Sequence, residues 1–168
     1  MPREVNTFYQ FVRRAYEMLV AGANYLQAPL LLALRVYFFW QLFLAGKGKL
    51  LNIGQTAEFF ESLKIPLPLL SAYLASATEC FGGLLLVVGL CSRLVAIPVA
   101  FTMLVAYFTA DFEALTSIFS DPDKFVAAAP FPFLLVSLLI LAFGPGAISI
   151  DALIKRFAAR QRPNTVRF

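Results

Sequence analysis

Long apolar runs separated by short polar segments dominate the hydrophobic pattern of the chain. A helix that crosses a bilayer needs about 20 consecutive apolar residues, and four runs approach or reach that length. They cover residues 29–47, 69–90, 94–109 and 126–143. Only the tripeptide Cys-Ser-Arg joins the second run to the third, so these two helices must be antiparallel neighbours. The pattern predicts an all-α fold, an integral membrane bundle of four helices.

Shorter amphipathic segments lie outside these four runs. Between residues 7 and 26, apolar residues recur at helical spacing, and the opposite side carries Gln10, Arg13, Arg14 and Glu17. This pattern predicts an N-terminal amphipathic helix on the membrane surface, with its basic face toward lipid headgroups. Short amphipathic helices are also expected in the outer loops, most clearly in the stretch TAEFFESLKIPLP. The predicted domains are an interfacial segment (1–27), a four-helix domain (28–154) and a basic tail (155–168).

The composition supports membrane insertion, and the distribution of charge predicts its orientation. Hydrophobic residues make up 60% of the chain and charged residues only 14%, against about 25% charged in soluble proteins. Nine Lys and Arg residues lie in the N-terminal segment, the tripeptide connection and the tail, whereas four lie on the opposite face, at the end of the first run and in the two long loops. The positive-inside rule then predicts a multi-pass protein of the plasma (inner) membrane with both termini in the cytoplasm. The bases form no patch interleaved with aromatics, so nucleic acid is not an expected partner.

Two ionisable residues lie within the predicted crossing helices, Arg35 in the first and Glu79 in the second. A charge at the bilayer centre costs about 2.5–3.5 kcal/mol, so each is a functional hypothesis that needs a partner. At about 1.5 Å per residue, Arg35 is about 9–10 Å and Glu79 about 16 Å from the same side, a difference that an arginine side chain spans. An Arg35–Glu79 pair is therefore predicted, either structural or as a ligand or proton site. Two alternatives stay open: Arg35 extends to the headgroups, and Glu79 is protonated and hydrogen-bonded to a neighbouring helix.

The cysteines and the missing histidine limit the chemistry of the chain. Cys80 and Cys91 are eleven residues apart on one predicted helix, about 16 Å, which exceeds the reach of a disulfide. The chain contains no histidine, which excludes bis-histidine haem ligation and the usual zinc, copper and di-iron sites. No nucleophile with a base and no metal ligand set is visible. Any redox chemistry therefore needs a diffusible or partner-held cofactor.

Three stretches carry a resemblance to a known family: ALRVYFFWQLFLAGKGKL, FFESLKIPLPLLSAYLASATECFGGLLLVVGLCSRLVA and FGPGAISIDALI. Over residues 28–154 the chain resembles the DoxX family of small four-helix bacterial and archaeal membrane proteins. Some members are associated with quinone-linked thiosulfate oxidation, and others with membrane redox or detoxification complexes. The positions that match the family's recurrent pattern are Arg35, Lys49, Glu79, Gly82, Gly83 and Arg93.

The resemblance and the buried charges lead to one main hypothesis and two alternatives. The main hypothesis is a redox-associated membrane component that binds a quinone-like or other small amphiphile between its helices. Arg35 and Glu79 would anchor the polar head, and Tyr37, Trp40 and Tyr107 would supply aromatic contacts. The first alternative is a non-catalytic subunit that anchors or assembles a larger complex, with lipid and other membrane subunits, or further copies of itself, as partners. The second alternative is a small-solute carrier.

Overall fold

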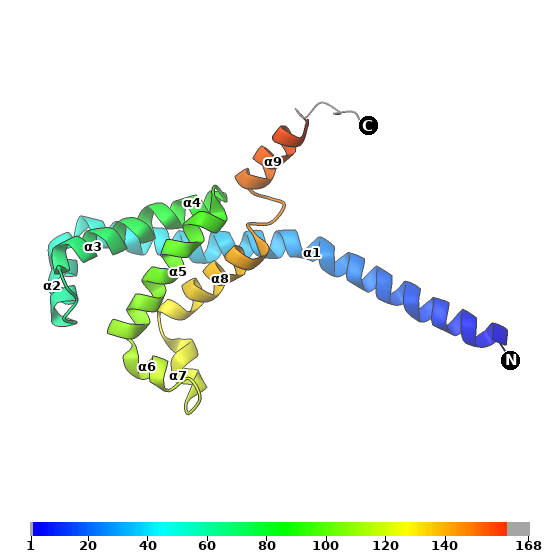
Figure 1. Cartoon of the computed structure of the whole chain (residues 1–168), viewed down its shortest axis with the longest axis horizontal. Helices are drawn as coiled ribbons and strands as arrows, with labels where there is room; N and C mark the ends of the chain where they lie inside the picture. Colours follow the sequence, from blue (N-terminus) through cyan, green and yellow to red (C-terminus); the bar gives the residue numbers. More distant parts are fainter. Residues whose placement is uncertain (1, 161–168) are drawn as a thin grey trace, which may run out of the picture.

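The computed structural model describes residues 2–160, and side chains from residue 9 onward. All regular elements in this part of the chain are helical (Figure 1). They are α1 (Pro2–Leu51), α2 (Ile53–Ser62), α3 (Pro68–Ala77), the π-helical turn η1 (Thr78–Gly82), α4 (Gly83–Val88), α5 (Ser92–Thr109), α6 (Phe112–Thr116), α7 (Pro122–Ala127), α8 (Pro130–Phe143) and α9 (Ile150–Arg160). The all-α prediction is confirmed.

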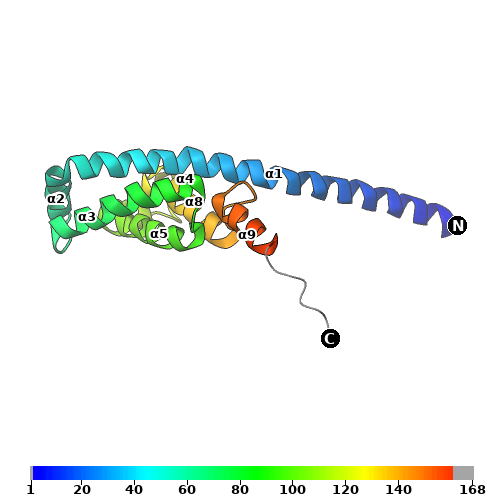
Figure 2. The same ribbon diagram turned by 90° about the horizontal axis from the view of Figure 1, so that it is seen from above.

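Helix α1 is a single helix of 50 residues, and this corrects the predicted break between an interfacial segment and the first crossing helix. Pro29 lies inside α1. The strong helix formers around it, mainly Leu and Ala, maintain the helix although the proline removes one backbone donor. At about 1.5 Å per residue the helix is roughly 75 Å long, more than twice the hydrocarbon thickness of a bilayer. Its N-terminal half projects away from all other elements (Figures 1 and 2).

The second and third crossing helices agree with their predictions to within two residues. The second is formed by α3, η1 and α4 in one continuous run, Pro68–Val88. It ends at Gly89, whose φ of 74° is the left-handed conformation that glycine adopts without strain after a helix. The third is α5, of 18 residues, and it returns antiparallel to the second after a tight turn through Cys91.

The fourth helix is shorter than the predicted run 126–143. Ala128 has an extended backbone, so α7 ends before it and α8 begins only at Pro130. Among the described residues, three helices are long and apolar enough to cross a membrane, and α8 is an apolar helix of 14 residues. The sequence pattern missed this division because residues 126–129 are as apolar as the helix that follows them.

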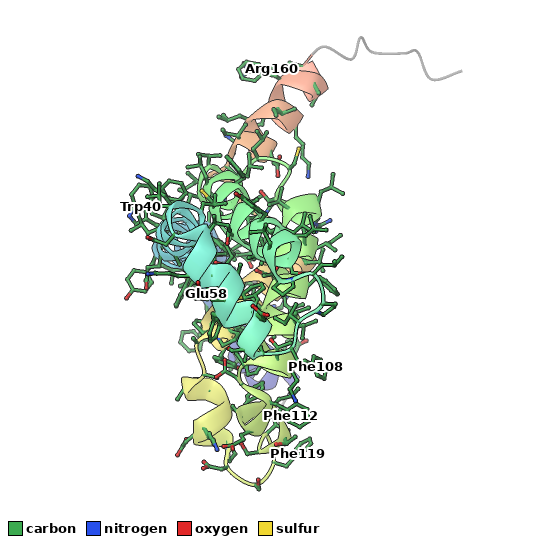
Figure 3. The ribbon with its side chains drawn as sticks, turned by 90° about the vertical axis from the view of Figure 1, so that its left-hand side faces the viewer. Trp40, Glu58, Phe108, Phe112, Phe119 and Arg160 are labelled. Atoms are coloured by element: carbon green, nitrogen blue, oxygen red, sulfur yellow. The ribbon has the colours of Figure 1, made fainter. Side chains whose placement is uncertain are left out.

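The bundle is built around α1, which runs over α3 and α4 while α5 and α8 pack together beneath (Figure 2). The central core contains Phe39, Leu42, Leu86, Ala96, Val99, Met103, Val136 and Ile140. The short helices α6 and α7 lie together at one side of the molecule, where Figure 3 labels Phe112 and Phe119. The predicted boundary between domain and tail falls inside α9, and residues 161–168 of the predicted tail lie outside the described residues.

Candidate functional site

Two glycines determine how closely α1 approaches the second crossing helix. A Cβ atom on Gly46 would collide with the backbone of Glu79 and Cys80. A Cβ atom on Gly83 would lie 2.9 Å from the amide nitrogen of Phe43. The neighbouring Gly82 instead faces α5 and is not part of this contact. Small residues thus allow two helix backbones to pack directly against each other, as is common in membrane bundles.

This contact fixes the register, and the register shows that the predicted Arg35–Glu79 pair is wrong. Glu79 lies beside Gly46, which is eleven residues, or about 16 Å, further along α1 than Arg35. The predicted depth of Arg35 in the membrane was measured from Pro29, taken as the start of the first crossing helix. Because α1 runs through Pro29, that reference point does not exist, and the two side chains lie near opposite ends of the bundle.

Lys49 is the partner of Glu79. Its Nζ donates to both carboxylate oxygens, at 2.7 and 2.8 Å. The Glu79 side chain is only 5% exposed, whereas the Lys49 side chain is 40% exposed. Lys49 follows Gly46 by three residues, so the close contact of the helices brings its long side chain over the carboxylate. The sequence identified Lys49 only as a family-pattern position.

Glu79 belongs to η1, a single turn of π-helix inside the second crossing helix. Such a turn adds one residue to the helix and changes the direction of the side chains that follow, and it is often found at functional sites. Here it lies against both α1 and α5. The turn contains the buried carboxylate and Gly82, which faces α5, and Gly83 directly after it faces α1.

An open hollow of about 430 Å³ lies next to the ion pair, where α1 meets α2. The residues that line it are Ala45, Gly48, Lys49, Asn52, Gln55, Thr56, Phe59 and Phe60. Thr56 Oγ1 donates to the carbonyl oxygens of Asn52, at 3.1 Å, and Lys49, at 3.3 Å, which holds α2 against the end of α1. Lys49 is the residue that both lines the hollow and contacts the buried carboxylate.

Arg35 has a different environment from the one predicted. It is 2% exposed, and its guanidinium donates to three carbonyl oxygens: Val87 at 3.2 Å, Pro145 at 2.6 Å and Ile148 at 2.8 Å. It thereby joins the end of α4 to the segment that follows α8. Its donors point at the backbone, so Arg35 is a structural connector in this fold and does not anchor the Glu79 site.

The same end of the bundle holds a carboxylate that the sequence analysis missed. Asp151 accepts hydrogen bonds from the backbone amides of Cys91 and Ser92, each at 2.8 Å, and so caps the start of α5 from a distant part of the chain. Burial alone would raise the pKa of Asp151, but the hydrogen bonds from Ser92 and Cys91 bring it below its usual range. Arg93 donates to the carbonyl of Ala142 at 3.0 Å, near the end of α8. No local sequence signal reveals a cap supplied by a residue 60 positions away.

The three predicted aromatic contacts do not gather around Glu79. Tyr37 and Trp40 are 65% and 48% exposed and lie on the outer side of α1, where Figure 3 labels Trp40. Tyr107 is buried, donates its hydroxyl to the carbonyl of Phe125 at 2.9 Å and stacks on the Phe125 ring. The aromatic residues of the hollow are instead Phe59 and Phe60, which sequence reasoning did not select.

Both cysteines are free thiols, Cys80 buried in η1 and Cys91 exposed in the turn before α5. Within residues described by the structure, no group of three His, Cys, Asp or Glu side chains is placed to hold a metal ion. The chemistry that remains in the hollow is that of an ammonium donor, amide and hydroxyl groups, and two phenyl rings.

The helices and the buried ion pair define the class of this protein: an all-helical membrane protein with paired charges inside its bundle. The DoxX family model matches residues 30–111, a match that supports membership of the DoxX family. The match contains Arg35, Lys49, Glu79, Gly82, Gly83 and Arg93, and it ends before α6. No curated protein and no solved structure matches the chain.

Proposed function

We propose that this protein binds a small amphiphile with a hydrogen-bond-accepting head, of the quinone type, in the hollow beside Lys49. The observation that carries the proposal is that one side chain joins a buried carboxylate to an open cavity. Ligand cavities commonly measure about 300–1,000 Å³, a range that includes this one. The proposal keeps the amphiphile of the sequence analysis but places it at the end of α1, with Lys49 in place of Arg35.

The donors of the hollow fit a carbonyl-bearing head. An ammonium group has three N–H donors, and Glu79 accepts from Lys49 with two oxygens. One N–H of Lys49 would remain for a ligand, because the Lys49 side chain is 40% exposed and lines the hollow together with Gln55. Phe59 and Phe60 offer aromatic surface for a flat ring.

A bound quinone would supply an electron acceptor that the side chains of this chain do not contain. The chain's own contribution would be to orient the head and to hold protons near it. Glu79 fixes the direction of the Lys49 Nζ, because both of its carboxylate oxygens accept a hydrogen bond from that atom. With both termini in the cytoplasm, as the charge distribution predicts, the hollow opens at the outer side of the membrane.

The test compares two lysines at the same end of α1. Lys49→Met removes the ammonium from the hollow, whereas Lys47→Met removes an exposed ammonium that does not line it. Binding of a short-tailed quinone to the purified proteins is measured by equilibrium dialysis. A hydrogen bond from a charged donor contributes about 1.5–3 kcal/mol, so we expect Lys49→Met to weaken binding at least tenfold and Lys47→Met to leave it unchanged.

The double variant Lys49→Met/Glu79→Gln separates binding from folding, because it removes both charges of the ion pair together and leaves neither one without its partner. We expect it to remain folded and to lack quinone binding. Equal affinity in the wild-type protein and in Lys49→Met, or no saturable binding by the wild-type protein, would contradict the proposal.

A second candidate function is the anchoring or assembly of a larger membrane complex. The observation that favours it is the half of α1 that projects from the bundle (Figure 1), where nearly all side chains described from residue 9 to residue 27 are exposed. Mild extraction from native membranes followed by native electrophoresis tests this function. Migration in an assembly with other proteins supports it, and migration free of other proteins contradicts it.

A further inference from the structure

The projecting half of α1 exposes many apolar side chains. From residue 9 to residue 27, every side chain except that of Val20 is exposed. Phe11, Met18 and Leu19 are each 70% exposed or more. A row of large apolar side chains along one helix marks a surface that is covered in the working protein.

These side chains follow a heptad pattern. In register with Val12 as the first a position, the a and d residues are Val12, Ala15, Leu19, Gly22 and Leu26. Their spacing alternates between three and four residues, as in a coiled coil. The polar residues fall at the outward b, c and f positions: Gln10, Arg13, Arg14, Glu17, Asn24 and Gln27. We call the a and d row the α1 seam.

The α1 seam continues into the part of α1 that crosses the membrane. The same spacing leads to Pro29, Ala33, Val36 and Trp40, all of which are exposed. The residues that α1 buries in the bundle, Arg35, Phe39, Leu42 and Gly46, occupy other heptad positions. The seam is therefore one strip over residues 12–40, about four heptads, which is the length typical of a stable coiled coil. The seam includes Trp40 and borders Tyr37, two aromatic residues that do not contribute to the Glu79 site.

We propose that the α1 seam binds the α1 seam of a second copy of this chain. Two copies in one membrane have the same orientation, so their α1 helices run parallel and a two-fold axis along the membrane normal relates them. Each seam residue then faces its own counterpart. Ala15, Gly22 and Ala33 let the two backbones approach closely.

Charge and shape favour a second copy over a lipid surface. Every a, d, e and g position between residues 11 and 40 is uncharged, so no like charges meet when identical helices pair. Arg13 and Glu17 form an ion pair at 2.8 Å on the outward face and stay in water. A membrane surface covers a helix that lies flat, but α1 continues straight from the bundle (Figure 2).

The area of the seam is sufficient for a specific dimer. A stable interface buries about 800 Å² per partner. Phe11, Tyr16 and Tyr25 border the seam in its projecting half, and an aromatic side chain can bury about 150–250 Å². When fully buried, these three rings alone would provide more than half of the required area, and the seam residues of both halves of α1 would provide the rest.

Disulfide trapping tests the pairing directly. In a chain with both native cysteines replaced by serine, Leu19→Cys and Leu26→Cys place thiols in the seam, and Glu17→Cys and Asn24→Cys place them on the polar face. Only seam positions bring the two Cα atoms within disulfide reach. After oxidation in intact membranes with copper–phenanthroline, we expect at least tenfold more covalent dimer from the two seam variants. All four residues are exposed in the projecting half, so the substitutions leave the bundle intact.

A charge substitution provides an independent readout. Leu19→Lys should convert the detergent-solubilised dimer to monomer, while the matched Asn24→Lys on the polar face should leave it dimeric, as measured by native mass spectrometry. Equal trapping at seam and polar positions overturns the proposal. So does a wild-type chain that is monomeric, or one whose seam cysteines cross-link only to a different protein.

Discussion

Arg35 and Glu79 are both buried in this bundle, and each is stabilised in a different way. Arg35 donates to three backbone carbonyls, whereas Glu79 forms an ion pair with Lys49. A guanidinium can use carbonyl acceptors because it has five donors in a fixed plane. A carboxylate has only acceptors and needs donors, which a helical backbone in a membrane does not offer. The partner of Glu79 therefore had to be a side chain.

The first prediction concerns the energetic coupling between Glu79 and Lys49. Glu79→Gln and Lys49→Met each break the ion pair, so the double variant should lose less stability than the sum of the single variants. We expect a coupling of about 0.5–3 kcal/mol from thermal unfolding in detergent. The control cycle joins Glu79→Gln with Arg35→Gln, and it should be additive within about 0.3–0.5 kcal/mol because the two residues do not meet. Coupling in the control cycle with additivity in the first would contradict the register of α1.

At the scale of the helices, the close contact of α1 with the second crossing helix positions the ion pair. Gly46 and Gly83 bring α1 against η1 and α4, and this contact places Lys49 over Glu79. Gly48, two residues after Gly46, has no atom within 4 Å of the place where a Cβ would lie. Gly46 and Gly48, both near the C-terminal end of α1, therefore provide a matched pair for substitution.

The second prediction compares Gly46→Ala with Gly48→Ala. The new methyl at residue 46 would press against backbone, which cannot move aside as a flexible side chain can. We expect Gly46→Ala to destabilise the protein by about 1–3 kcal/mol in detergent unfolding. Gly48→Ala should be neutral or stabilising by up to about 1 kcal/mol, because alanine favours a helix. Equal stability of the two variants would mean that α1 does not pack directly on η1.

Much of the helical arrangement could be predicted from hydropathy, but the contacts between helices could not. The runs at 69–90 and 94–109 match observed helices because lipid requires a continuous apolar segment. The Arg35–Glu79 prediction failed because hydropathy locates a segment and does not locate its register against a neighbour. Lys49 stands at the end of an apolar run, where a lysine is expected to reach headgroups, so nothing local identified it as a buried partner. The Asp151 cap depends on the whole fold and leaves no local pattern.

For the whole molecule, the unequal distribution of bases predicts the orientation in the membrane. The projecting half of α1 and helix α9 lie on one side of the bundle, and α2, α6 and α7 lie toward the other (Figure 1). This arrangement is the one that an even number of crossings requires. In the predicted orientation, the Arg35 and Asp151 contacts would lie near the cytoplasm and the Lys49–Glu79 pair near the outer surface.

The third prediction tests this orientation with single cysteines in a chain that lacks Cys80 and Cys91. Phe119→Cys, at a residue that is 95% exposed between α6 and α7, should react with a membrane-impermeant maleimide in intact cells. Arg160→Cys, at the end of α9, should react only after the membrane is opened (Figure 3). The reverse labelling pattern would place the termini outside and the proposed hollow on the cytoplasmic side.

The uninterrupted length of α1 has a mechanical consequence. One continuous helix contains the residues that cross the lipid and the residues that extend beyond it, so tilting of the crossing part also moves the projecting part. Residues 2–27 extend about 39 Å from the bundle at 1.5 Å per residue. A crossing helix adjusts its tilt to the thickness of the surrounding bilayer. With this geometry, a small change in the tilt of the crossing part of α1 displaces the N-terminal end of the helix sideways by several ångströms or more.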